Sequence, residues 1–481
     1  MKRFSRRKIL NATVVSAGTL GGINLPKRAK SQFSWMKQPV PNTPSGPRRL
    51  PFDTNNPAII YHPMNCERCG DCVSICRDVQ TVFDHTGNFP ANEVPCIHCG
   101  QCTANCWSNA VTERFELQPL YSALMENKQS SRKKKFVALV APSVRVTLGE
   151  MFKMPPGTNV EKQTVSALRK LGFDYVFDVT FSADLTVLEE AAELEARLNK
   201  KHSGDGSQMP LFTSCCPAWV KFAQLFYPKL LPHISSCKSP IMMHGAVIKT
   251  WFASQNGLKP EDIVTVAITP CTAKKYERTL GTMNEIDFAL TTRELGWWMM
   301  EFNLDPKTLE EGEFDSTLGN GSGAGDIFGN TGGVTEAVLR QVYFDLEGKE
   351  APKDFLALSP IRGMDGVRQA EVKIGNKSLR VAVVHGTASA RRLLDSPNFS
   401  SMNLDFVEVM ACRGGCVGGG GLPKTQIPIS DELKAQRIQG LYASDQKHQI
   451  RRSGANPEIQ KLYELFLKKT GNEILHTQRK G

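Results

Sequence analysis

Short apolar runs alternate with longer stretches of helical periodicity over most of the chain after residue 135. Runs rich in β-branched and aromatic residues predict buried strands at 136–142, 175–179, 264–270, 379–386 and 406–411. Apolar residues recur at helical spacing at about 183–200 and 332–346, which predicts two helices. This alternation is typical of an α/β fold, in which sites form at the carboxyl ends of strands.

Composition and length place the chain among ordinary globular proteins. Its 481 residues suggest two to four domains. Hydrophobic residues make up 41% and charged residues 22% of the chain. This composition excludes a mainly disordered, collagen-like or coiled-coil protein. The sequence contains no run of 18 apolar residues, so a conventional membrane span is not expected.

The net charge of +11 comes from one end of the chain. Residues 1–50 hold 11 Lys and Arg and no Asp or Glu, and the remaining residues hold 48 basic and 48 acidic side chains. A general surface for nucleic acid is therefore not expected.

Eight of the 14 cysteines fall in two runs with the spacing C-x-x-C-x-x-C-x-x-x-C, at 66–76 and 96–106. In such runs, three close thiolates bind one 4Fe–4S cluster and the fourth binds the neighbouring cluster. One predicted ligand set is Cys66, Cys69, Cys72 and Cys106, and the other is Cys96, Cys99, Cys102 and Cys76. Zinc sites or disulfides are the alternative interpretation.

Residues 58–116 resemble a bacterial two-cluster ferredoxin domain, which implies an α+β unit that carries electrons. Gly70 and Gly100 stand where the binding loops have to turn tightly. The proline that usually follows the fourth cysteine is replaced by Arg77 and Trp107.

Three further motifs follow predicted strands: TSCCPAW (213–219), TPCTAKKYE (269–277) and EVMACRGGCVGGGGLP (408–423). Each motif alone is weak evidence for a metal site, because a single buried cysteine is usually a small core residue. Together they closely resemble the signature segments of iron-only (FeFe) hydrogenases, over about residues 58–478. The resemblance implies an α/β catalytic domain at 130–425, with two lobes of β-sheet flanked by helices.

The resemblance also implies the ligands of the catalytic H-cluster, which joins a 4Fe–4S cluster to a diiron subsite carrying CO, cyanide and a bridging dithiolate. Its metal ligands would be Cys216, Cys271, Cys412 and Cys416, with Cys416 bridging the two parts. Lys274 and Ser143, the latter beside Pro142, would face the cyanides, and Phe328 and Met410 would supply apolar surroundings. The glycines at 418–421 would allow the backbone to approach the cofactor closely.

A proton route is implied through Cys215, Glu190, Ser235, Glu193 and Arg197. Positions 190, 193 and 197 share one helix face, as a relay requires, although an ordinary solvated acidic face would show the same spacing. Thr269 and Ile241 depart from residues common in the family, and Cys237 has no family role, so a buried structural thiol is expected there.

Both ends of the chain carry further signals. Arg6 and Arg7 precede a weakly apolar run, so residues 1–30 resemble a twin-arginine export signal, with a basic flexible tail as the alternative. Residues 31–57 predict a proline-rich linker, and 435–478 resemble the small-subunit region of the family. We therefore expect an enzyme exported to the periplasm already folded.

The resulting hypothesis is reversible H2 oxidation and proton reduction, running as H2 uptake. Expected partners are a c-type cytochrome or a ferredoxin, the hydrogenase maturation proteins and the twin-arginine translocase. An H2 sensor and a hydrogenase-like iron–sulfur assembly scaffold without the diiron site are the rival functions.

Overall fold

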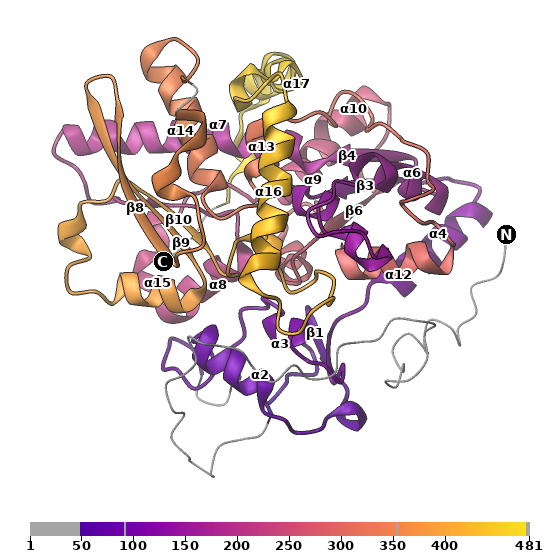
Figure 1. The fold of residues 1–481 in the computed structure, drawn as a ribbon. Coiled ribbons are helices and arrows are strands. Elements are labelled where there is room, and N and C mark those ends of the chain that lie inside the picture. The colour runs from indigo at the N-terminus through magenta and orange to yellow at the C-terminus, as the bar shows by residue number, and fades with distance from the viewer. Residues whose placement is uncertain (1–48, 91–92, 353–354, 478–481) are drawn as a thin grey trace.

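The computed structural model describes residues 49–90, 93–352 and 355–477. The main body contains two four-stranded sheets with helices around them, and a smaller unit with a two-stranded sheet lies at one end of it (Figure 1). The expected signal at 1–30 and most of the expected linker at 31–57 lie outside the described residues. No helix in the described ranges combines the length and apolarity needed to cross a membrane.

The first sheet is fully parallel, with strand order β4-β3-β6-β7. Its strands are β3 (Lys135–Val140), β4 (Tyr175–Asp178), β6 (Ile263–Thr269) and β7 (Phe288–Thr291). Every residue of the central strand β6 is buried. Helices cover both faces of such a sheet, which is why its inner strands read as unbroken apolar runs.

The second sheet has the order β5-β10-β9-β8. Its strands are β5 (Leu211–Phe212), β8 (Val367–Ile374), β9 (Lys377–His385) and β10 (Phe406–Met410). The first three neighbours run parallel, and β8 returns antiparallel along β9. Exposed residues interrupt the edge strand β8, because that edge meets water.

The five strands expected from the sequence correspond to β3, β4, β6, β9 and β10, and the two expected helices to α7 and α14. Strands β5, β7 and β8 were not anticipated. The longer helices are α4 (Leu117–Gln129), α6 (Glu161–Leu171), α7 (Val179–His202), α8 (Pro217–Phe226), α9 (Pro240–Val247), α12 (Thr292–Glu301), α14 (Gly333–Glu347), α15 (Thr387–Leu394) and α16 (Asp431–Lys447). The shorter ones are α2 (Asp71–Ser74), α3 (Gln101–Ala104), α5 (Pro142–Arg145), α10 (Ala253–Gln255), α11 (Ala273–Glu277), α13 (Gly323–Ile327), α17 (Pro457–Leu462) and α18 (Lys468–Thr470).

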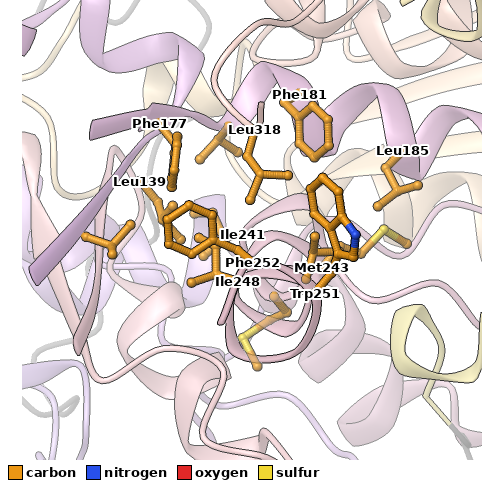
Figure 2. Packing of buried hydrophobic residues seen from close by; sticks show 14 of the residues in the cluster. Leu139, Phe177, Phe181, Leu185, Ile241, Met243, Ile248, Trp251, Phe252 and Leu318 are labelled. Carbon is orange, nitrogen blue, oxygen red and sulfur yellow. The ribbon is translucent and has the colours of Figure 1, made fainter. Parts of the chain in front are cut away.

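A dense apolar core joins the first sheet to α7 and α9 (Figure 2). The rings of Phe177 and Phe252 meet edge to face with centroids 5.4 Å apart. Ile241 of α9 lies in this core with 4% of its surface exposed. The core thus fixes α7 and α9 relative to the first sheet.

Helix α16 connects the two lobes of the main body and crosses the middle of the view in Figure 1. Near its start, Arg437 donates to both carboxylate oxygens of Glu150, which follows the first sheet's strand β3, at 2.7 Å. Near its end, Asp445 accepts from Arg340 of α14 at 2.9 Å. These side chains are buried, so the two ion pairs hold α16 against both lobes.

The smaller unit consists of two cysteine loops closed by an antiparallel pair of strands, β1 (Ile59–Tyr61) and β2 (Val111–Glu113). Gly70 and Gly100 directly precede helices α2 and α3, and their φ angles are +87° and +67°. Glycine adopts this left-handed conformation at the lowest cost, which agrees with the tight turns expected there.

Candidate active site and cluster-binding cysteines

Strand ends from both sheets deliver the cysteines of the three motifs to one place. Cys215 and Cys216 follow β5, Cys271 follows β6, and Cys412 and Cys416 follow β10. The carboxyl edges of the two sheets therefore face a common site, as expected for an α/β protein.

The four expected ligands of the catalytic cluster lie near one another. Burial raises the pKa of the Cys412 thiol well above its usual value, and the charges of Cys271, Cys216 and Cys416 raise it further. Burial likewise raises the pKa of Cys271 to about 12, with Cys216 contributing. Four thiolates this close together would be unfavourable on their own, and the positively charged core of an iron–sulfur cluster would stabilise them.

Local backbone geometry explains how the last two ligands come together. Gly414 and Gly415 have φ angles of +86° and +85°, so the chain reverses between Cys412 and Cys416. Cys216 precedes Pro217, the first residue of α8, which fixes the backbone direction there.

In the described ranges, no three His, Cys, Asp or Glu side chains converge closely enough to hold a single metal ion.

The glycines at 418–421 lie close to protein atoms. A Cβ on Gly419 would meet the carbonyl oxygen of Pro270 at 2.4 Å, and one on Gly420 would meet that of Cys99 at 2.4 Å. The observed close approach is thus between segments of the chain, including the smaller unit. Approach to the cofactor stays a prediction.

Cys215 is buried beside α7, the helix expected to carry the proton relay. Burial raises the pKa of the Cys215 thiol well above its usual value, and the charge of Glu190 is the next cause. The Glu190 carboxylate accepts from the backbone N–H of Ser214 at 3.3 Å. A neutral thiol therefore lies near a buried carboxylate, as a proton donor and acceptor pair would.

The remaining relay residues form a connected hydrogen-bond network. Ser235 donates to Glu193 Oε2 at 2.8 Å, and Arg197 Nη2 donates to Glu193 Oε1 at 2.6 Å. Ser236 also donates to Glu193 through its backbone N–H at 3.1 Å, and its hydroxyl lies 2.9 Å from His476 Nδ1. The carboxylate of Glu193 is thus the centre of the network.

Lys274 approaches Cys215 from α11. Its Nζ donates to the carbonyl oxygen of Cys215 at 3.3 Å and to Glu277 Oε2 at 2.7 Å. Burial alone would lower the pKa of Lys274, but the charge and hydrogen bond of Glu277, together with the charges of Cys271 and Cys215, outweigh it and the pKa rises. Lys274 is therefore a fixed cation beside Cys215.

The expected cofactor contacts Pro142 and Ser143 open helix α5, directly after β3. The Ser143 hydroxyl is buried without a hydrogen-bond partner among the described residues, and so are both amide atoms of Asn330. Buried polar groups normally have partners, so these atoms fit a site built around an additional polar group. Phe328 and Met410 pack in one apolar cluster with Cys215.

The three departures from the family pattern have defined positions. Thr269 ends β6, and its hydroxyl accepts from the backbone N–H of Cys271 at 3.3 Å, a contact that methionine could not make. Ile241 belongs to the apolar core described above. Cys237 is fully buried, and its backbone N–H donates to Ser235 at 3.2 Å.

The effect of neighbouring charges shows which of the smaller unit's cysteines lie close to one another. Burial raises the pKa of Cys72, and the charges of Cys106 and Cys69 contribute. Burial also raises the pKa of Cys76 to about 12, with Cys96 as the next cause. Cys106 thus lies near Cys72, and Cys76 lies near Cys96, while the full division into two ligand sets stays a prediction.

A cavity of about 200 Å³ lies at the second group and is lined by Cys76, Cys96, Cys99 and Cys102. Asn56 donates to Cys96 Sγ at 3.4 Å. The ring of His98 stacks on that of Tyr276 at 4.2 Å, where the smaller unit meets the main body.

Sequence reasoning did not single out Gln101, Glu277 or Asn330. Gln101 lies inside a cysteine motif, and Glu277 follows Lys274 by three residues on a helix. The local sequence could therefore have marked both residues as candidates for the site. Asn330 stands alone in a glycine-rich stretch, and only its burial marks it.

Comparisons with known proteins match these features. The family model "Iron only hydrogenase large subunit, C-terminal domain" matches residues 134–420, and "Iron hydrogenase small subunit" matches 431–478. "NADP-reducing hydrogenase subunit HndD" of Solidesulfovibrio fructosivorans is 40% identical over 87% of this chain and 74% of its own length. "Periplasmic [Fe] hydrogenase large subunit" of Nitratidesulfovibrio vulgaris is 44% identical over 62% of this chain and 71% of its own.

A solved structure of "[FeFe]-hydrogenase HydA1" from Chlamydomonas reinhardtii, variant E141A, superposes with a TM-score of 0.66 at 37% identity, covering 75% of this chain and 98% of that one. More distant relatives include "Cytosolic iron-sulfur assembly component 3" of Bos taurus, 28% identical over 79% of this chain and 82% of its own.

Proposed function

From the membership of this chain in the iron-only hydrogenase family, we propose that it interconverts H2 with two protons and two electrons at the site where its two sheets meet. The chain is an oxidoreductase acting on H2. The observation that carries the proposed site is the convergence of four cysteines from three strand ends beside Cys215 and Lys274.

Cys216, Cys271, Cys412 and Cys416 would hold the H-cluster, which supplies heterolytic cleavage of H2 when it is bound. Lys274 would fix its orientation by donating a charge-assisted hydrogen bond from the side of Cys215. Ser143 and the backbone near Pro142 would donate from the start of α5, just after the carboxyl end of β3. Phe328 and Met410, which pack in the apolar cluster with Cys215, would keep water from this side of the site.

The proton would pass from Cys215 to Glu190, then through Ser235 and Glu193 to Arg197. The support for this order is geometric: Glu193 already accepts from Ser235 and pairs with Arg197, whose side chain is only 9% exposed. A half-buried carboxylate between a hydroxyl and a guanidinium can accept a proton and pass it on without a large rearrangement.

Electrons would leave through two 4Fe–4S clusters in residues 58–116, bound as the two cysteine groups above. The order follows from the contact of Gly420 with the carbonyl of Cys99, which brings the second group next to the main body. The group around Cys69, whose side chain is exposed, would then face the external partner.

We further propose that the chain works in the periplasm as an H2-uptake enzyme that passes electrons to a c-type cytochrome or ferredoxin. The periplasmic relative and the paired arginines at the N-terminus support this location. Maturation proteins would insert the diiron subsite before a twin-arginine translocase exports the folded chain.

The test is viologen-coupled H2 oxidation by the anaerobically purified full chain, co-expressed with the maturation enzymes. We expect rapid turnover together with infrared bands of bound CO and cyanide. A full iron load with these bands and without turnover would contradict the enzyme and favour an H2 sensor.

One alternative has a specific observation in its favour, since distant relatives are iron–sulfur assembly components. A scaffold of that kind would bind 4Fe–4S clusters and lack the diiron subsite. Absence of CO and cyanide bands, with a working hydrogenase as maturation control, would support the scaffold. The positions of Cys215, Lys274 and Cys416 favour the hydrogenase.

A further inference from the structure

Gln101 connects the two halves of the proposed electron path. It is the first residue of α3 and lies between Cys99 and Cys102, two cysteines of the second group in the smaller unit. Its side chain leaves that unit and donates from Nε2 to Cys412 Sγ at 3.3 Å. The residues in this contact are 311 positions apart in the chain.

The amide of Gln101 has both of its N–H groups directed at the main body. The same Nε2 donates to the carbonyl oxygen of Gly418 at 2.9 Å, on the segment that follows Cys416. An amide nitrogen carries two hydrogens, so one can serve the sulfur and the other the carbonyl. The side chain is therefore oriented by two bonds rather than by one.

The backbone around Gln101 is fixed by other residues. Thr103 donates to the carbonyl of Gly420 at 3.2 Å, and Arg293 donates to the same carbonyl at 2.8 Å. Thr272 donates to the carbonyl of His98 at 2.7 Å. Removing the Gln101 amide thus leaves the two units in contact, and the role of the amide can be separated from docking.

We propose that Gln101 is a positioning residue that sets the reduction potential of the 4Fe–4S part of the catalytic cluster by hydrogen bonding to its ligand Cys412. The inference rests on the proposed function, since it assumes that Cys412 is a cluster ligand. Each electron that leaves the catalytic cubane for the neighbouring cluster oxidises the first by one electron and reduces the second by one.

The direction of the effect follows from electrostatics. Reduction adds negative charge to the cluster and its thiolates, so an N–H donor stabilises the reduced state more than the oxidised one. Hydrogen bonds to sulfur are among the factors that set cluster potentials. The Gln101 amide therefore raises the potential of the catalytic cubane relative to the adjacent cluster.

The test is an EPR-monitored redox titration of the full chain produced without the diiron maturation enzymes, so that only 4Fe–4S clusters are present. We expect Gln101→Leu to lower the midpoint potential of the catalytic cubane. A tenfold change in the electron equilibrium would appear as a shift of about 59 mV for one electron. Gln101→Glu should lower the same potential, because it removes the donors and adds negative charge.

Gln118→Leu is the matched control. Gln118 lies on α4, contacts no cysteine, and donates to the Ser122 hydroxyl at 3.4 Å. Gln101 variants with three clusters and an unchanged potential of the catalytic cubane would overturn the inference. An equal shift of all three clusters, or the same shift in Gln118→Leu, would also overturn it. Lack of a third cluster in the unmodified chain would instead contradict the proposed function.

Discussion

Two adjacent cysteines have different surroundings, and the difference supports the different roles proposed for them. Burial raises the pKa of Cys216, but backbone hydrogen bonds from Ala411 and Trp219 and the charge of Lys274 act against it. Burial also raises the pKa of Cys215, and there the charges of Glu190 and Cys216 add to it. A supported thiolate suits a metal ligand, and a thiol kept neutral suits a proton carrier.

Replacing Cys215 by Ala should nearly abolish H2 oxidation while the iron content and the infrared bands persist. Loss of a group that transfers a proton typically costs 10²–10⁴-fold, so we expect a decrease of at least about 100-fold. Cys216→Ala should instead reduce the iron content. Substantial turnover in Cys215→Ala would contradict the proposed proton route.

Glu193→Gln should slow turnover by a similar factor of about 10²–10⁴, because the amide keeps the shape of the carboxylate and cannot accept a proton. The chain supplies a control on the same helix, Glu195→Gln, whose carboxylate faces Asp345 and Lys377. Turnover and its solvent isotope effect would be compared in both variants. Equal activities of the two variants would exclude Glu193 from the route.

At the scale of elements, the end of α16 carries a pH-sensitive contact. His448, the residue that follows α16, lies 3.0 Å from Asp326 Oδ2 through its Nε2. This hydrogen bond raises the pKa of His448 above 6.5, although burial and the charge of Arg145 oppose it and Asp178 assists. A positive charge at a helix carboxyl end also interacts favourably with the helix dipole.

The sign of the pH effect follows from the raised pKa. The charged pair contributes its full stability below pH 6.5 and loses it as the pH rises through the folded-state pKa. We expect His448→Gln to lower the melting temperature at about pH 6 and to have little effect at about pH 9. Thermal unfolding of both proteins at the two pH values measures this, and a pH-independent difference would disprove it.

At the scale of the molecule, Arg293 joins three segments that are far apart in the chain. From α12 it donates to both oxygens of Glu113 in β2, at 3.0 and 2.7 Å. It also donates to the carbonyls of Gly420 and Leu422. The arginine and the glutamate are both buried. One side chain of the main body therefore binds the smaller unit through an ion pair and the site-forming loop through hydrogen bonds.

Arg293→Met should leave Glu113 as a buried charge without its partner, which typically costs about 3–5 kcal/mol. We expect the smaller unit to unfold at a lower temperature than the main body in this variant. Circular dichroism and cluster absorbance, recorded during heating, would show two transitions. A single transition at the temperature of the unmodified chain would contradict this role.

The sequence predicted the parts of this fold that local patterns determine. Strands such as β6 were predictable because burial on both faces makes their sequences continuously apolar. Strand β5 was missed because two residues carry no periodicity, and β8 because an edge strand is interrupted by polar residues.

The candidate site also has parts that the sequence predicts and parts that it does not. Cysteine spacing and family resemblance were enough to name the expected ligands. The contact of Gln101 with Cys412 and the burial of Asn330 arise only when distant segments fold together, so no local pattern could predict them.

The junction of two carboxyl edges also has a consequence for how the protein is made. The catalytic thiols begin at Cys216 and end at Cys416, so a ribosome has to release most of the chain before the set is complete. Contacts between residues so distant in sequence form late and slowly. Cluster loading would then be limited to chains whose two lobes have already brought their cysteines together.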